Sequence, residues 1–338
     1  MNVVYSCSDL FAEICGVSLY SLFSCNKDAD EIVVYIFDNG ITSGSKDKLN
    51  SIANEFNRTI IYIPMPKVKD VYPDVDMDLG HTFTRMVLGR LLPQTVHRVL
   101  SLDSDTVIMD SLHDLYETDL GSNCIGGVYD CVGKAIQKDF LHADDDIDYC
   151  NAGVFLIDLD KWRKDNVEED MMNLILRERD KIFFLEQDVM NRIFAKKITL
   201  LHPRYNMISF VYCFKYDEVM RMKKPVKYYS RQLVEDAQTK PAILHATTCF
   251  YIKKRMWIAG SDHPYAKFYN EYRQHTPWNK EPMMADNRKL SKKINSCLWH
   301  LLPRPLVVML ATFLINELRP IVAKLSAKIS YNPIANQS

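Results

Sequence analysis

The sequence lacks most of the features that assign a chain to a class at once. Its 42 lysines and arginines nearly balance 43 aspartates and glutamates, so it has none of the basic excess that nucleic-acid binding requires. It has no apolar run of about 20 residues, the length that a helix needs to cross a bilayer. Internal repeats, low-complexity segments and a phosphate-binding loop motif with its lysine are also absent. We therefore expect a globular protein that neither binds nucleic acid nor spans a membrane.

The cysteines also lack a pattern. Nine are scattered along the chain and none forms a CxxC pair. The first residues, MNVVYSC, enter an apolar run without the basic region of a secretory signal. We therefore expect reduced thiols, mostly in the core, in a protein that stays in the cytoplasm.

What the chain does contain is an alternation of apolar and amphipathic segments. Hydrophobic residues make up 47% of its 338 residues, enough for a large core. Short apolar runs alternate with segments whose apolar residues recur at helical spacing. This predicts an α/β fold with a mostly parallel, Rossmann-like sheet flanked by helices. The expected strands are 3–7, 32–37, 60–63, 98–102, 125–129, 154–157 and 243–244, and the expected helices are 9–26 (capped by Asp9), 45–56, 82–92, 167–181 and 187–194.

Two aspartates, Asp103 and Asp105, follow the expected strand 98–102. Ligands of open α/β sheets gather at the carboxyl ends of strands. Two carboxylates at one such end repel each other unless a cation such as Mg²⁺ or Mn²⁺ lies between them. Because these cations commonly carry phosphates, the pair predicts a metal site for a nucleotide or phosphate. An ordinary acidic turn is the alternative. The acidic run 144–146 is expected to be a solvated loop.

The chain changes character after about residue 278. From Arg288 to the end it carries eight lysines and arginines and a single acid, Glu317, whereas the preceding residues carry a net charge of −8. Apolar residues at helical spacing accompany these basic residues around 289–302 and 318–328. We expect residues 278–338 to form basic amphipathic helices that attach a catalytic domain, residues 1–277, to an anionic membrane surface. A helical hairpin packed on that domain is the alternative.

Several segments, taken in order over about residues 1–275, resemble the family 8 glycosyltransferases. This group includes lipopolysaccharide galactosyl- and glucosyltransferases and the glycogenins. The resemblance implies a GT-A fold, a UDP-sugar donor, Mn²⁺, and transfer with retention of anomeric configuration. The segments that carry it are Ser18–Leu22, Thr84–Met86 with Leu91–Pro93, Asp103-Ser104-Asp105, Cys150–Val154, Leu185–Asp188 and Ile243–His245.

The resemblance also implies roles at the metal and the diphosphate. Asp103 and Asp105, with Ser104 between them, would hold the metal, and His245 would complete its protein ligands. An imidazole ligand favours Mn²⁺ over Mg²⁺, although Mg²⁺ is possible. Arg85 would reach the sugar or the diphosphate.

Four further residues are expected around the reacting sugar. The resemblance places Gln187 near the anomeric carbon and Asp188 at the sugar hydroxyls. Asp130, directly after 125–129, is placed to accept from a hydroxyl of the donor or the acceptor. Asn151 begins an Asn-Ala-Gly turn, where it can bond sugar hydroxyls while small residues let the backbone come close. For Asn151 a plain turn is the alternative, and for Asp188 a helix cap.

The chain departs from the family pattern in two places. The first strand ends in Ser6-Cys7-Ser8-Asp9-Leu10, which keeps one acid of the uridine-binding turn and loses its asparagine. The segment after His245 is about four residues longer than the family motif. It lacks that motif's glycine and proline but offers Lys253, Lys254 or Arg255 as the cation for the diphosphate.

Together these features predict a retaining transferase that moves glucose or galactose from a UDP-sugar to a saccharide or glycolipid acceptor in lipopolysaccharide or cell-surface polysaccharide synthesis. The predicted location is the cytoplasmic face of the cell membrane. Two alternatives stay open. In a haloacid-dehalogenase-like phosphatase, Asp103 would attack phosphate and Asp105 would act as acid and base. In a non-enzymatic peripheral membrane scaffold, the C-terminal region would be the functional part.

Overall fold

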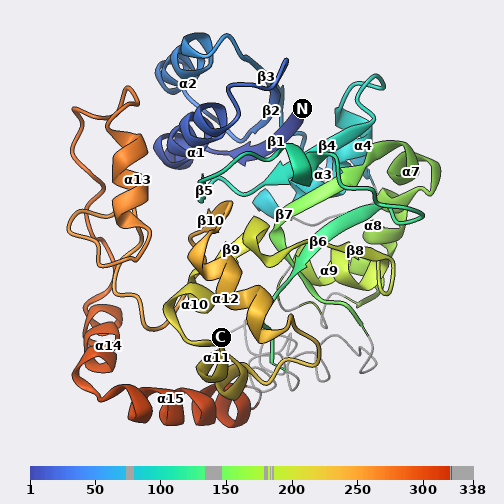
Figure 1. Cartoon of the computed structure of the whole chain (residues 1–338). Helices are drawn as coiled ribbons and strands as arrows, with labels where there is room; N and C mark the ends of the chain where they lie inside the picture. Colours follow the sequence, from blue (N-terminus) through green and yellow to red (C-terminus); the bar gives the residue numbers. More distant parts are fainter. Residues whose placement is uncertain are drawn as a thin grey trace, which may run out of the picture.

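The computed structural model describes residues 1–73, 80–133, 147–178, 182, 184, 186–319 and 321. Its centre is a seven-stranded sheet in the order β3-β2-β1-β4-β7-β6-β8 (Figure 1). All neighbouring strands are parallel except β7, which runs antiparallel to β4 and β6. The predicted α/β fold with a mostly parallel sheet is therefore confirmed. The strands are β1 (Asn2–Cys7), β2 (Val33–Asp38), β3 (Thr59–Pro64), β4 (Arg98–Leu102), β6 (Ile125–Tyr129), β7 (Cys150–Asp158) and β8 (Ile198–Leu200).

Residues 151–153, which were expected to form an Asn-Ala-Gly turn, belong to strand β7. The strand begins at Cys150, so residues 151–153 are extended and buried instead of forming a turn before 154–157. Cys150 pairs with Tyr129 across an irregularity in β6 between Gly127 and Tyr129. The backbone N–H groups of Ala152 and Gly153 donate to side chains, Gln187 Oε1 and Asn151 Oδ1, each at 3.0 Å. Side-chain acceptors thus allow these polar residues to lie inside a buried strand.

A second sheet of three short strands lies beside the first. Its order is β5 (Thr106–Ile108), β10 (Ile243–His245) and β9 (Met207–Ile208), with β10 antiparallel to β5 and parallel to β9. The sequence predicted β10 only. The small sheet brings His245 to Asp105, because it pairs His245 with Thr106, the residue that directly follows Asp105.

Helices cover both faces of the large sheet (Figure 1). The first helix begins at Ala12, after a short 3-10 turn, and Asp9 does not cap it. The Asp9 carboxylate instead accepts from the backbone N–H and the hydroxyl of Thr42. The expected helix 82–92 is split, because Val87 (φ −133°, ψ 18°) interrupts it. The elements are η1 (Asp9–Phe11), α1 (Ala12–Cys25), α2 (Ser43–Glu55), α3 (Val68–Val71), η2 (Gly80–Val87), α4 (Leu88–Leu91), α5 (His113–Tyr116), α7 (Leu159–Lys164), α8 (Val167–Glu178), α9 (Glu186–Ile193), η4 (Pro203–Asn206), α10 (Ser209–Cys213), α11 (Tyr216–Lys223), α12 (Arg231–Thr239), α13 (Ala266–Arg273), α14 (Leu290–Leu301), α15 (Arg304–Phe313) and η5 (Leu314–Leu318).

The core runs through both sheets and includes most of the thiols. Trp162, Tyr5 and Phe37 are among its largest fully buried side chains. All nine cysteines are free, and six of them are buried. Of the nine, Cys297 is the exposed one. The acidic run 144–146 lies outside the described residues.

The C-terminal region is helical as far as it is described. Helix α15 packs on α11 through Val307, Val308 and Ala311, and Arg304 pairs with Glu218 at 2.9 Å. Helix α14 exposes Leu290, Ile294, Leu298 and Leu301, whereas its Trp299 packs toward the core. Within the described part of the chain, every helix is too short or too polar to cross a membrane. The division into residues 1–277 and 278–338 stays a prediction.

Candidate active site

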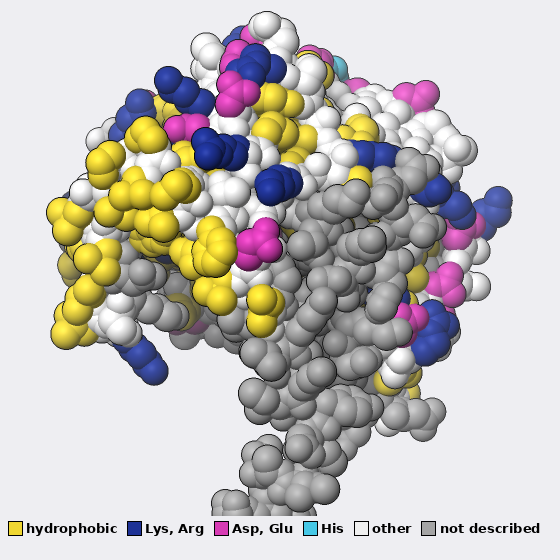
Figure 2. Space-filling view, turned by 90° about the horizontal axis from the view of Figure 1, so that it is seen from below, with side chains coloured by type: hydrophobic (Ala, Val, Ile, Leu, Met, Phe, Trp, Pro, Cys, Tyr) yellow, Lys and Arg dark blue, Asp and Glu magenta, His cyan; other side chains and the backbone are white. Residues whose placement is uncertain are grey.

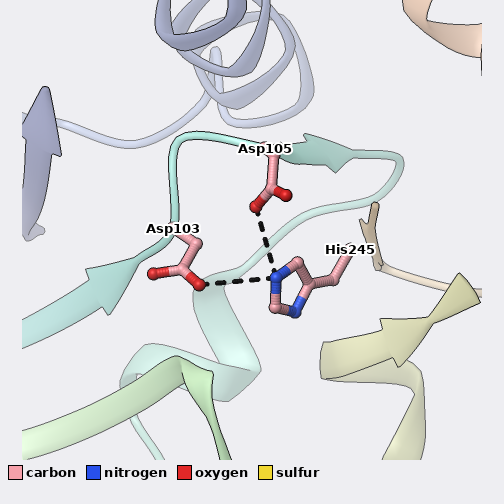
Figure 3. Close-up of side chains that lie close together, drawn as sticks. All are labelled: Asp103, Asp105 and His245. Carbon is pink, nitrogen blue, oxygen red and sulfur yellow. Dashed lines mark ion pairs between the residues drawn. The ribbon is translucent and has the colours of Figure 1, made fainter. Parts of the chain in front are cut away.

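Three predicted metal ligands converge where the two sheets meet (Figure 3). Asp103 follows β4, Asp105 lies in the turn to β5, and His245 ends β10. The Nε2 atom of His245 lies 3.4 Å from Asp103 Oδ2 and 3.3 Å from Asp105 Oδ1. One ligand atom from each residue fits within 4.8 Å of the others. Two carboxylates and an imidazole nitrogen at this spacing form a donor set that suits Mn²⁺ or Mg²⁺.

The strand neighbours explain how the three side chains reach one another. Backbone hydrogen bonds join Asp103 N to Gly153 O at 2.9 Å and Ala246 N to Asp105 O at 3.0 Å. Gly153 leaves the space that the imidazole fills, since a Cβ there would lie 2.1 Å from His245 Cε1. The small residue was expected to admit a ligand to the backbone. It admits the ring of His245 instead.

The electrostatics of the cluster favour a cation. Burial alone would lower the pKa of His245, but the carboxylates of Asp105 and Asp103 raise it to about 9. Burial alone would raise the pKa of Asp103, but Arg85 and then His245 hold it well below its ordinary value. Asp103 therefore stays ionised, and the two carboxylates stabilise positive charge between them.

An open cavity of about 250 Å³ lies against this cluster. Arg85 is buried beneath it: its Nε donates to Ser101 Oγ at 3.0 Å, and its two terminal nitrogens pair with the carboxylates of Asp103 and Glu186. Six of the predicted site residues line the cavity together with two that were not predicted. The lining residues are Ser6, Ser8, Phe11, Arg85, Asp103, Ser104, Asp105 and Glu186.

The two residues that the sequence did not assign to the site are Phe11 and Glu186. Phe11 falls within the expected helix 9–26, but it lies in the 3-10 turn η1, where it is 37% exposed and its ring meets Trp257 edge to face at 6.2 Å. Burial raises the pKa of Glu186 to about 7 although Arg85 opposes this. Glu186 Oε2 is buried and has no hydrogen-bond partner among the described residues. A carboxylate oxygen of this kind can accept a hydrogen bond from a sugar hydroxyl. The position of Glu186 directly before Gln187 was the signal in the sequence that could have assigned it to the site.

The residues expected at the sugar form a connected polar group behind the cavity. Gln187 Nε2 donates to Asp130 Oδ2 at 2.9 Å, and Asn151 Nδ2 donates to the same oxygen at 3.1 Å. Asp188 is fully buried and accepts from Tyr149 Oη and from the backbone N–H of Phe184, both at 2.6 Å. The cavity lining therefore includes Glu186 and not Asp188.

Residues 246–257, here called the basic loop, carry the three candidate cations. Arg255 Nη1 lies 3.6 Å from Asp105 Oδ2, and the guanidinium lies over the ring of Trp257 at 5.3 Å. Lys254 Nζ instead donates to the carbonyls of Ala259 and Gly260 at 2.9 and 3.1 Å. Of the three, Arg255 is the cation that the structure places beside the candidate metal ligand Asp105.

The end of α14 supports the basic loop. Trp299 meets Phe250 edge to face at 4.8 Å, and His300 stacks on Tyr251 at 4.5 Å. His300 Nε2 lies 2.6 Å from the Tyr251 carbonyl oxygen. The guanidinium of Arg304 lies over the ring of Tyr251, 5.0 Å from its centre. The loop that carries Arg255 is thus packed against the C-terminal helices.

Comparison with known proteins gives a consistent result. Residues 2–248 match the family described as "Glycosyl transferase family 8". General stress protein A of Bacillus subtilis is 24% identical over 286 residues, which cover 82% of this chain and 95% of that protein. The lipopolysaccharide 1,2-glucosyltransferase of Escherichia coli K12 is 23% identical over 83% of this chain and 80% of its own length. A crystal structure of the galactosyltransferase LgtC with donor and acceptor sugar analogs superposes with a TM-score of 0.68 at 22% identity, covering 82% of this chain and 99% of LgtC. This likeness confirms the predicted GT-A fold.

Proposed function

The chain belongs to glycosyltransferase family 8, and from that premise we propose that it is a Mn²⁺-dependent, retaining hexosyltransferase using a UDP-sugar. It transfers glucose or galactose to a saccharide or glycolipid acceptor of lipopolysaccharide or cell-surface polysaccharide synthesis. The observation that carries the proposal is the convergence of Asp103, Asp105 and His245 beside a cavity that also contains Arg85 and an unpartnered Glu186 oxygen.

The donor would lie along this cavity with its three parts in order. Ser6, Ser8 and the exposed ring of Phe11 form the end suited to the base, since a flat ring stacks on an aromatic face. The diphosphate would lie at the aspartates, and the sugar toward Glu186. A cation held by Asp103, Asp105 and His245 would supply Lewis-acid stabilisation of the leaving diphosphate.

Residues of the chain add charge stabilisation of their own. Arg255, beside Asp105, is placed to pair with the diphosphate as negative charge grows on it. The proposed step breaks the bond from the anomeric carbon to the diphosphate oxygen. The acceptor hydroxyl forms the new bond on the same face, and its proton passes to the leaving phosphate. Gln187 is held by hydrogen bonds from Asn151 and from the Ala152 N–H. It would lie near the anomeric carbon, where positive charge develops as the bond to the diphosphate breaks.

The C-terminal helices support a second part of the proposal, attachment to an anionic membrane surface at the cytoplasmic face. Figure 2 shows hydrophobic side chains gathered on this side of the molecule beside lysines and arginines. Helix α15 packs its inner face against α11. The apolar residues on the outer faces of α14 and α15 stay exposed and are available to another partner. A basic helix pair with an apolar outer face suits anionic lipid. The outer residues are Leu290, Ile294, Leu298 and Leu301 on α14 and Met309 and Phe313 on α15.

A panel of UDP-sugars with Mn²⁺ tests the proposal. Hydrolysis and transfer are measured for UDP-glucose and UDP-galactose, and NMR assigns the anomeric configuration of the product. Retention and dependence on Asp105 are expected. An inverted product, or normal turnover of Asp105→Asn with Mn²⁺, would contradict the mechanism. Membrane binding without any binding of UDP would favour the non-enzymatic scaffold, and hydrolysis of generic phosphoesters the phosphatase.

A further inference from the structure

A buried asparagine outside the predicted site connects the metal cluster to the sugar end. Asn206 is the last residue of η4 and is 3% exposed. Its Oδ1 lies 2.9 Å from His245 Nδ1, and its Nδ2 donates to Asn151 Oδ1 at 2.9 Å. Asn151 in turn donates to Asp130 and Gln187. One amide therefore bridges a metal ligand and the polar group behind the sugar.

The direction of these hydrogen bonds is fixed by the backbone of β7. A backbone N–H can only donate, so the Gly153 N–H makes the Asn151 oxygen face it at 3.0 Å. The same oxygen then requires a donor from Asn206, which turns the Asn206 amide nitrogen toward it. The Asn206 oxygen consequently faces His245, and the Nδ1 atom of that ring must carry a hydrogen.

We propose that Asn206 is a positioning residue that holds His245 in the tautomer whose Nε2 is free to bind the metal. This rests on the metal site of the proposed function. Metal-binding histidines usually donate the N–H of their second ring nitrogen to an oxygen acceptor, which fixes the ring and its tautomer. Here the partner, Asn206, is itself held by Asn151. The orientation of His245 at the metal end therefore depends on the orientation of Asn151 at the sugar end.

Asparagine is suited to this position because both of its amide atoms are used. Aspartate would still accept from His245 Nδ1 but would place an acceptor against the Asn151 oxygen. Leucine has a similar shape and would leave the His245 Nδ1–H unpaired and the Asn151 oxygen with the Gly153 N–H as its one remaining donor. Both neighbours are buried, His245 at 4% exposed and Asn151 at 7%, so water does not readily replace the lost partner.

Mn²⁺ affinity of the full chain, measured by electron paramagnetic resonance without any donor sugar, tests the proposal. We expect Asn206→Leu to weaken Mn²⁺ binding at least about tenfold. Asn206→Asp should stay within a few-fold of wild type, because it keeps the acceptor for Nδ1. Asn26→Leu is the matched control: Asn26 is 4% exposed and also uses both amide atoms, with Leu22 and Leu112, but lies away from the cluster. It should lower the thermal midpoint and leave Mn²⁺ binding unchanged.

Two results would overturn the assignment of Asn206. One is wild-type Mn²⁺ affinity in a folded Asn206→Leu variant. The other is an equal loss of affinity in Asn26→Leu, which would make the effect one of general stability. The proposed hexosyltransferase activity fails separately: normal Mn²⁺ binding with no transfer from any UDP-sugar would remove that activity and leave the role of Asn206 standing.

Discussion

Arg255 lies 3.6 Å from Asp105, although 149 residues separate them in the chain. The contact places one cation of the basic loop beside the candidate metal ligands Asp103, Asp105 and His245. Lys254, the neighbouring candidate, points its ammonium at the carbonyls of Ala259 and Gly260 instead. The contact with Asp105 therefore favours Arg255 as the cation for the diphosphate, a choice among Lys253, Lys254 and Arg255 that the sequence left open.

Arg255→Ala should raise the KM for the UDP-sugar, lower kcat, and reduce kcat/KM about 10- to 100-fold. A charge-assisted hydrogen bond contributes about 1.5–3 kcal/mol, which corresponds to that range. Steady-state kinetics with Mn²⁺ measure it, and Lys254→Ala serves as the comparison. A larger loss in Lys254→Ala than in Arg255→Ala would show that the assignment of the diphosphate cation is wrong.

Gly153→Ala should displace the ring of His245, because the new Cβ would lie 2.1 Å from Cε1 of that ring. We expect Mn²⁺ binding to weaken about 10- to 100-fold, as for the loss of an oriented ligand. Calorimetric titration with Mn²⁺ measures the change. Gly44→Ala is the control, since nothing lies within 4 Å of a Cβ at that position. Unchanged affinity in Gly153→Ala would mean that His245 does not bind the metal.

The Mn²⁺ affinity should depend on pH. With the pKa of His245 raised to about 9, the ring is protonated at neutral pH, and the metal must displace that proton. Affinity should therefore rise by about tenfold per pH unit between about pH 7 and pH 9 and level off above it. Titrations across this range test the slope. His245→Asn should bind more weakly and without this slope, and a flat profile in the wild-type chain would contradict the expected proton displacement.

The raised pKa of His245 has a second consequence, for stability without metal. The folded state holds a proton that the unfolded chain releases near pH 6.5, so this contribution is complete below that pH. It is lost as the pH rises through about 9. Thermal midpoints measured in chelator should therefore fall from pH 6.5 to pH 9 more steeply in wild type than in His245→Asn. Equal slopes in the two proteins would contradict this.

Leu298→Glu should weaken binding to vesicles that contain anionic lipid. A charge on the apolar face of α14 opposes burial of that face in the bilayer interface, and we expect at least about a fivefold loss. Co-sedimentation with the vesicles measures it. Leu176→Glu on α8 is the matched control, because both side chains are 52% exposed. Equal binding by both variants would remove the proposed role of α14.

Trp299→Ala separates the two faces of α14. The substitution removes the contact with Phe250 in the basic loop and leaves the outer leucines in place. We expect the KM for the UDP-sugar to rise a few-fold while vesicle binding stays unchanged, the reverse of Leu298→Glu. A Trp299→Ala variant with normal KM would show that the loop holds Arg255 without support from the helix.

The sequence by itself determined six of the seven strands of the large sheet, all but β8, and the position of the two carboxylates Asp103 and Asp105. Apolar runs such as 98–102 are buried on both faces, so composition alone marks them as strands, and the two aspartates follow directly. The ordered family motifs identified the fold. Phe11 shows the limit of this reasoning, because it falls within the expected helix 9–26, whereas the 3-10 turn η1 exposes it at the cavity.

Only the tertiary structure decided how the remaining site residues meet. His245 reaches the aspartates through β5, β10 and β9, which have three, three and two residues and are too short for a periodic pattern. Asn151 lies in a strand because side chains satisfy its neighbours, and Asn206 has no local pattern at all. The direction in which the loop points each side chain separates Arg255, beside Asp105, from Lys254, at the carbonyls of Ala259 and Gly260. These positions depend on contacts between distant segments, and local sequence determines strands and helices but not which of them become neighbours.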